Sequence, residues 1–169
     1  MESETYQEKG DEAETRFKEW LDLQNIPHWY IHQDLSTFSP SLKEYFGSKR
    51  PDFMILIPSI GFIFVDVKSR KMIQGYNKFP LDAEETMQYS NLQRNFNFPV
   101  WYVISNNEYG YKTWFWISAS RVLEIGKRET YTSNITKSDF YGIPISDFIQ
   151  IAFDDSLDRL FSRIFLKKK

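Results

Sequence analysis

The sequence predicts one α/β domain in which helices flank a mixed central sheet. Segments with helical periodicity alternate with short runs of aromatic and β-branched residues, and this alternation favours the class. The composition agrees, because 41% of the residues are hydrophobic and 18% are aromatic, as expected of an ordered globular core. The length of 169 residues is sufficient for one compact domain.

The first predicted helix covers residues 11–24, where apolar side chains recur at helical spacing. Its buried face is expected to contain Ala13, Phe17, Trp20, Leu21 and Gln24. Residues 28–33 predict a short strand. Residues 36–50, which include Pro40 and Gly47, predict a loop or a short helix.

Two apolar runs follow, residues 52–57 and 62–68, and the turn-like sequence PSIG between them predicts a β-hairpin. Both faces of the second run are apolar up to Val65, as in a central strand that is covered on both sides. Asp66 and Lys68 come next and share one face of the strand. Since an unpaired charge there costs several kcal/mol, we expect these side chains to be paired, to lie at the strand's open end or to hold a ligand.

A second helix is predicted over residues 81–97, followed by strands at residues 99–105 and 113–118. Side chains expected to share one side of that helix are Gln88, Leu92 and Phe96. Residues 154–165 predict a C-terminal amphipathic helix. The order is therefore a helix, three strands, a helix, two strands and a final helix.

The composition excludes several classes of function. Without cysteine the chain has no disulfide, thiolate metal site or cysteine nucleophile, which fits a reducing, cytoplasmic location. No apolar run approaches the ~20 residues that span a bilayer, and the acidic N-terminus is unlike a secretory signal peptide, so no membrane partner is expected. The net charge of −2 is not typical of a nucleic-acid-binding protein, although bases cluster at residues 49–50, 68–71 and 167–169.

The hairpin brings Asp52 back opposite residues 66–68 if the chain turns within PSIG. Asp52 faces Asp66 and Lys68 only if paired residue numbers sum to 118 or 120, which requires an odd-length loop or a bulge. Gly61 permits either. Two close carboxylates repel each other unless a cation intervenes, and such a site suits Mg²⁺ or Mn²⁺. A neighbouring lysine can orient a water and stabilise charge on a phosphate.

The residues RPD at 50–52 and FVDVKSRK at 64–71 resemble the motif of the PD-(D/E)XK nuclease superfamily. This superfamily includes many restriction endonucleases and archaeal-type Holliday junction resolvases. The resemblance implies a restriction-endonuclease-like αβββαβ core over about residues 10–118, within a single domain of residues 1–169. Residues 119–169 are then a C-terminal extension of undefined role, expected to be helical near its end.

The resemblance also implies the roles of individual residues. Asp52, Asp66 and the backbone carbonyl of Val67 would bind a divalent metal, and Lys68 would assist the attacking water. Glu14, on the first predicted helix, matches the glutamate that completes the metal site in resolvase-like members.

Further residues are candidates for contact with DNA. Some members of the superfamily carry a QxxxY motif on the second helix, but here Leu92 stands in place of the tyrosine. Gln88 therefore either reaches the site or is a surface residue. Four bases either follow a phosphate backbone or are solvated charges: Lys49, Arg50, Arg70 and Lys71.

The function predicted in this way is a divalent-metal-dependent DNA endonuclease that hydrolyses phosphodiester bonds. DNA as the substrate rests on the resemblance alone, and a homodimer is compatible with it because cutting two strands needs two sites. The alternatives are a catalytically silent domain that binds DNA or protein, a nuclease subunit of a restriction or transposition complex, and a structural α/β protein. In the last, Asp66 and Lys68 would form a structural ion pair.

Overall fold

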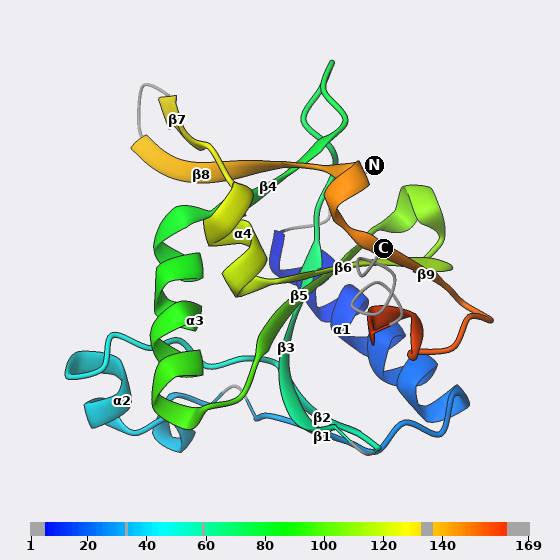
Figure 1. Cartoon of the computed structure of the whole chain (residues 1–169), viewed down its shortest axis with the longest axis horizontal. Helices are drawn as coiled ribbons and strands as arrows, with labels where there is room; N and C mark the ends of the chain where they lie inside the picture. The colour runs from blue at the N-terminus through cyan, green and yellow to red at the C-terminus, as the bar shows by residue number, and fades with distance from the viewer. Residues whose placement is uncertain (1–5, 33, 59, 133–136, 162–169) are drawn as a thin grey trace, which may run out of the picture.

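The computed structural model describes residues 6–32, 34–58, 60–132 and 137–161. Within these ranges the main sheet is six-stranded and mixed (Figure 1). In order across the sheet, its strands are β1 (His28–Tyr30), β2 (Phe53–Ile57), β3 (Gly61–Ser69), β5 (Val100–Ser105), β6 (Thr113–Ser118) and β9 (Ile149–Ala152). β3 and β5 are parallel, and the other neighbours are antiparallel. The predicted α/β class is confirmed.

Helices cover both faces of this sheet (Figure 1). α1 (Tyr6–Leu23) packs on one face, where the Phe17 ring lies 5.4 Å from that of Phe53 and 5.1 Å from that of Trp114. α3 (Ala83–Phe96) and α4 (Ala119–Ile125) pack on the other face, in a second cluster that contains Tyr89 and Leu92. The predicted inner face of α1 is confirmed for Ala13, Phe17, Trp20 and Leu21, which are fully buried. Gln24 was wrongly included, because it lies beyond the end of α1 and is only half-buried.

The predicted loop or short helix between β1 and β2 contains both a turn and a helix. A 3₁₀ turn (Leu35–Thr37) is followed by α2 (Pro40–Glu44), which begins with proline at a position where no backbone N–H is needed. Further 3₁₀ turns follow β5 (Asn107–Tyr109) and precede β9 (Ile145–Asp147). None of the helices in the described ranges is long and apolar enough to cross a membrane.

A second, three-stranded sheet lies beside α3 and α4 and was not predicted (Figure 1). Its order is β4 (Lys78–Asp82), β8 (Lys137–Pro144) and β7 (Arg128–Thr132). β4 contains Pro80, which argues against a strand in the sequence but is tolerated because β4 is an edge strand. The second helix consequently begins at Ala83 rather than at residue 81, and Asp82 caps it by accepting a hydrogen bond from the Glu85 N–H at 2.7 Å.

The chain beyond Ser118 is not only a helical extension. It supplies α4, β7, β8 and β9, and β9 completes the main sheet by pairing with β6. The helix predicted over residues 154–165 lies partly outside the described residues. Within them the chain turns at Phe153–Asp158 and is helical from Arg159 to Phe161.

The β2–β3 hairpin adopts one of the two registers that turn Asp52 toward the motif. Phe53 pairs with Val65 and Ile57 pairs with Gly61, so paired numbers sum to 118 and three residues form the loop. Gly61 has φ +118°, a conformation that favours glycine. The pairing ends at Phe53 and Val65, and just before it the Asp52 N–H donates to the Val65 carbonyl, so Asp52 lies beside residues 65–67.

Candidate active site

Backbone hydrogen bonds at the end of the hairpin hold Asp52 in place. Its N–H donates to the Val65 carbonyl at 3.0 Å, and its own carbonyl accepts from the Ile31 N–H at 2.7 Å. Its carboxylate accepts a hydrogen bond from the Val67 N–H at 2.7 Å. The side chains of Asp52 and Asp66 are therefore fixed on neighbouring strands, and the two residues are only 8% and 2% exposed.

Lys68 lies between two carboxylates. Its Nζ is 2.8 Å from Oδ2 of Asp66 and 3.0 Å from Oε1 of Glu85, in the first turn of α3. Glu85 also forms an ion pair with Lys49, from the segment before β2. These five residues, Asp52, Asp66, Lys68, Glu85 and Lys49, are called the β3-end cluster below.

Tyr89 supports this cluster from α3. Its fully buried hydroxyl donates to Oδ1 of Asp66 and lies 3.3 Å from the carbonyl of Arg50. Its ring packs against Tyr102 at a centroid distance of 5.6 Å. Because the ring is fixed by packing, the hydroxyl holds Asp66 in one orientation.

Glu14 approaches from α1 but is held by another residue. Its carboxylate accepts a hydrogen bond from the Tyr30 hydroxyl at 2.8 Å. Burial raises the pKa of Glu14, and the charge of Glu14 in turn raises the pKa of Asp52. The described residues contain no ready-made group of three or more His, Cys, Asp or Glu ligands. Glu14 is thus an electrostatic neighbour of the two aspartates, and its role as a third ligand stays a prediction.

Burial and mutual repulsion disfavour the charged forms of the two aspartates. Burial, followed by the charges of Asp66 and Glu14, holds the pKa of Asp52 well above its usual range. Burial also raises the pKa of Asp66, although Lys68 opposes it. For Glu85 burial acts in the same direction, but Lys68 and Lys49 outweigh it and lower the pKa. Asp66 and Glu85 likewise outweigh burial at Lys68, whose pKa is raised, so this side chain is a stable ammonium.

The two aspartates fit a divalent cation on two observations. Oδ2 of Asp66 is buried, and the partner nearest to it among the described residues is the Lys68 ammonium at 2.8 Å, in an ion pair. With Glu14 included, four carboxylates face two ammonium groups, which leaves an excess of two negative charges. A divalent cation would balance this excess. Val67 contacts Asp52 through its N–H, and its carbonyl as a ligand stays a prediction.

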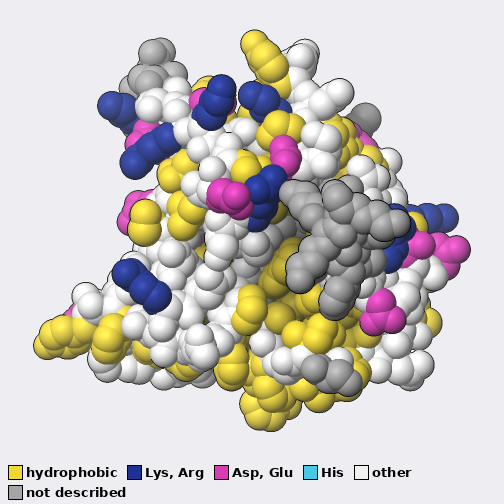
Figure 2. All heavy atoms as spheres, in the orientation of Figure 1, with side chains coloured by type: hydrophobic (Ala, Val, Ile, Leu, Met, Phe, Trp, Pro, Cys, Tyr) yellow, Lys and Arg dark blue, Asp and Glu magenta, His cyan; other side chains and the backbone are white. Residues whose placement is uncertain are grey.

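Of the predicted DNA-contacting residues, Lys49, Arg50 and Gln88 line one cavity, whereas Arg70 and Lys71 do not. Lys49 belongs to the β3-end cluster, whereas the Lys71 ammonium pairs with Glu108 at 2.8 Å on the surface. The guanidinium of Arg50 bonds to the Asp34 carbonyl and to Thr37, and that of Arg70 donates to the Ser69 carbonyl at 3.3 Å. On the face in Figure 2, Lys and Arg gather mainly over β7, β8 and α4 and form no continuous band.

Sequence reasoning missed Glu85 and Tyr89. The predicted side of α3 contains Gln88, Leu92 and Phe96; Leu92 is buried, but Gln88 is half-buried and Phe96 is 41% exposed. The residues that face the sheet are Ala83, Thr86, Tyr89 and Leu92. The four-residue spacing of Glu85 and Tyr89, which puts both on one side of the helix, was the available signal.

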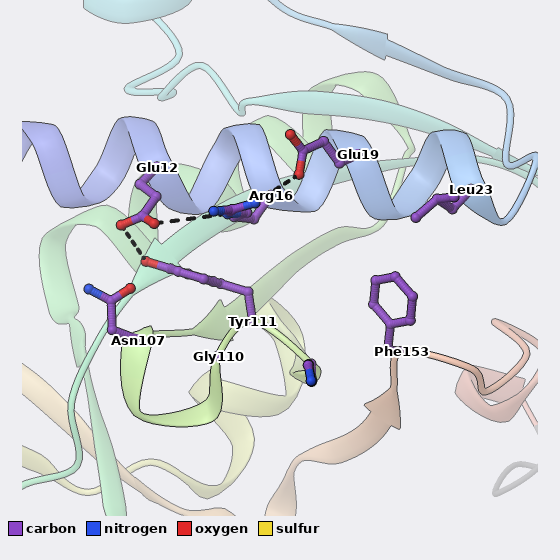
Figure 3. Close-up of a pocket in the computed structure, with 9 residues that line it drawn as sticks. Glu12, Arg16, Glu19, Leu23, Asn107, Gly110, Tyr111 and Phe153 are labelled. Atoms are coloured by element: carbon purple, nitrogen blue, oxygen red, sulfur yellow. Dashed lines mark hydrogen bonds and ion pairs between the residues drawn. The ribbon is translucent and has the colours of Figure 1, made fainter.

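A separate cavity of about 450 Å³ lies between α1 and the segment after β5 (Figure 3). Three of its charged residues pair with one another: Arg16 lies 3.9 Å from Glu12 and 3.3 Å from Glu19. The Tyr111 hydroxyl lies 3.4 Å from Glu12. None of the predicted catalytic residues lines it. Glu12, Arg16 and Glu19 are called the α1 surface group below.

Comparisons with known proteins identify the fold. No protein-family model matches the sequence, and no curated protein matches it. Among solved structures, the chain is similar to Hjc, a Holliday junction resolvase from Archaeoglobus fulgidus, with a TM-score of 0.53 and 13% identity over 90% of this chain and 94% of that one. It is also similar to D212, a nuclease from a fusselovirus, with a TM-score of 0.50 and 14% identity over 99% and 94%.

A bacterial homing endonuclease, I-Ssp6803I, gives a TM-score of 0.48 and 14% identity over 82% of this chain and 75% of that one. At 13% and 14% identity, the similarity to Hjc and to D212 is a similarity of fold. It agrees with the mixed main sheet and with the helices on both of its faces. The chain therefore has a restriction-endonuclease-like fold, as predicted from the sequence.

Proposed function

We propose that the protein is a divalent-metal-dependent DNA endonuclease that hydrolyses phosphodiester bonds. The observation that carries the proposal is the hairpin register, which places two buried carboxylates, Asp52 and Asp66, on neighbouring strands with Lys68 beside them. Likeness in fold to a Holliday junction resolvase and a viral nuclease supports it.

Asp52 and Asp66 would hold Mg²⁺ or Mn²⁺, with the Val67 carbonyl and Glu14 as the further predicted ligands. A divalent cation at this place supplies Lewis-acid stabilisation of the charge that develops on a phosphate. Tyr89 keeps Asp66 oriented through its hydrogen bond to Oδ1. The carboxylates thus act as a fixed anionic pair that needs little rearrangement.

Lys68 would act as a cation rather than as a base. Its raised pKa keeps the side chain protonated at neutral pH, so it can donate hydrogen bonds to a water or to a phosphate oxygen. Glu85 holds the ammonium with both oxygens, at 3.0 and 3.1 Å. When Asp66 engages a cation, this contact keeps Lys68 in position, and Glu85 is therefore a positioning residue.

Cleavage of a panel of DNA substrates tests the proposal. Purified protein with Mg²⁺ or Mn²⁺ is expected to cut at least one of linear duplex, single-stranded, nicked, flapped and four-way DNA. Asp66→Asn should lower the rate by about 10³-fold or more while leaving a cooperative unfolding transition. Glu19→Gln, in the α1 surface group, is the matched control and should cleave normally. Binding of DNA without cleavage of any substrate would favour the catalytically silent domain instead.

A further inference from the structure

A cavity beside the β3-end cluster has the chemistry of a nucleotide-binding subsite. Its volume is about 490 Å³, within the ~300–1,000 Å³ that is usual for small-ligand sites. The segment that includes α2 forms one wall, and α3 forms the other through Gln88. Among the residues that line it are Phe38, Lys43, Ser48, Lys49, Arg50 and Gln88.

Contacts with α3 fix the wall of this cavity. The Asn91 side-chain amide donates to the Gly47 carbonyl at 3.1 Å, and the Tyr89 hydroxyl lies 3.3 Å from the Arg50 carbonyl. Gly47 has φ +52°, and a Cβ there would lie 3.2 Å from the Asn91 side chain, so glycine suits this close approach. Lys49 is tied to Glu85 by an ion pair. The cavity is therefore held by the same helix that supports the catalytic residues.

The lining matches a nucleotide better than a phosphate alone. The lining has three cations, Lys43, Lys49 and Arg50, against the carboxylate of Glu44. With Glu85, the partner of Lys49, included, one positive charge remains in excess and favours an anionic ligand. Phe38 is half-buried and offers a ring on which a base can stack. The Gln88 amide makes no hydrogen bond to any described residue, and an amide has both donors and an acceptor for the edge of a base.

The cavity is connected to the scissile site through charged contacts. Lys49 lines the cavity and pairs with Glu85, which holds Lys68 beside Asp66. A nucleotide in the cavity would consequently neighbour the phosphate at the two aspartates. A base stacked within a duplex cannot enter such a pocket unless it is unpaired or extruded.

We propose that this cavity binds an unpaired nucleotide of the DNA substrate, next to the phosphodiester bond that is cleaved. The inference rests on the proposed nuclease function and extends it by naming the substrate class. The enzyme is expected to prefer DNA with an unpaired nucleotide, such as a bulge or a single-stranded segment, over fully paired duplex.

Fluorescence of 2-aminopurine tests the proposal without cleavage, in protein that carries Asp66→Asn. The probe is placed in a one-nucleotide bulge, in the same sequence fully paired, and in a single strand. Binding is expected to change the fluorescence of the bulged and single-stranded probes more than that of the paired probe. Phe38→Ala should weaken binding of bulged DNA by roughly 5- to 150-fold, the usual value of one base-stacking contact, and should affect paired duplex less.

Two further variants separate stacking in the cavity from general effects. Gln88→Ala, on the opposite wall, should also reduce the preference for bulged DNA, and it provides a second test if Phe38→Ala is poorly folded. Tyr45→Ala is the matched control, because Tyr45 belongs to the same segment, is 84% exposed and does not line the cavity. Equal losses in Phe38→Ala and Tyr45→Ala, or equal losses for bulged and paired DNA, would overturn the inference.

The failure of this inference is distinguishable from failure of the proposed function. If wild-type protein cuts bulged and paired DNA at the same rate, the nuclease stands and the subsite is wrong. If wild-type protein cuts no DNA but the probe response depends on Phe38 and Gln88, the subsite stands and the catalytic proposal is wrong.

Discussion

The β3-end cluster and the α1 surface group both combine carboxylates with lysine or arginine, but they differ in burial. In the α1 surface group, the side chains of Arg16 and Glu19 are 51% and 57% exposed. In the β3-end cluster, those of Lys68 and Asp66 are only 14% and 2% exposed. Exposed pairs contribute about 0–1 kcal/mol, because water solvates either partner nearly as well. Buried charges lose that solvation and require compensation from their surroundings.

This difference separates a solvated surface from a candidate site. In the α1 surface group, Arg16 pairs with both glutamates, and water solvates the one negative charge that remains, because these side chains are accessible to it. The β3-end cluster leaves Asp52 and Asp66 with raised pKa values, even though Lys68 and Lys49 are present. Burial of uncompensated carboxylates weakens a fold and is retained where chemistry uses it. Three changes test this contrast.

Metal-dependent stabilisation should show the largest effect. At a Mn²⁺ concentration of about 100 times the Kd, binding to the native state adds about 2.7 kcal/mol to the free energy of unfolding. The Tm of wild type should therefore rise with Mn²⁺, whereas that of Asp52→Ala should not. Glu12→Ala, from the α1 surface group, should keep the wild-type shift. A similar rise in Asp52→Ala would show that the ion binds elsewhere.

Neutralisation of Glu85 should reduce the rate of cleavage without preventing the binding of DNA. Glu85→Gln keeps the shape of the side chain but weakens its hold on Lys68, and we expect kcat to fall by roughly 10- to 100-fold, as for other supporting residues at metal sites. KM should change little. Glu84→Gln is the matched control, because Glu84 lies in the same turn of α3 but is exposed. Steady-state cleavage kinetics measure both, and equal kcat values would remove Glu85 from the site.

The smallest effect is expected in the pH dependence of stability without metal, where replacement of Asp52 should raise the Tm. An aspartate with a raised native pKa destabilises the fold when it is charged, and this cost disappears as the pH falls through the native pKa toward the unfolded value of about 3.9. In EDTA, Asp52→Asn should therefore have a higher Tm than wild type at pH 8, and the gap should narrow toward pH 5. A pH-independent gap for Asp52→Asn would contradict burial and carboxylate repulsion as the source of the raised pKa.

Local patterns in the sequence were sufficient for the first helix and for the hairpin that carries Asp52 and Asp66. The apolar periodicity of residues 11–24 reflects burial of one face of α1. The continuous apolar run in residues 62–65 reflects a strand that is covered on both sides. The sequence allows two registers of this hairpin, because the loop geometry depends on the backbone at Gly61 and not on the pattern of side chains.

The rest of the site depends on contacts between distant segments. Glu85 and Lys49 are 36 residues apart, and both are charged, so neither contributes to an apolar pattern. Tyr89 is fully buried, but Phe96 at the end of the same helix misled the choice of face because helix ends are less covered. The strand β7 (Arg128–Thr132) is polar, and it is stabilised by pairing with β8, which no local signal reveals.

The three-residue loop of the β2–β3 hairpin makes chain length itself part of the candidate site. Strand residues alternate between faces, so a shift of one residue turns a side chain to the opposite side of the sheet. If one residue were deleted or inserted between Ile57 and Gly61, the hairpin could keep either the pairing of its apolar residues or the position of Asp52, but not both. In a family of natural variants, this turn should therefore tolerate changes of residue type more readily than changes of length.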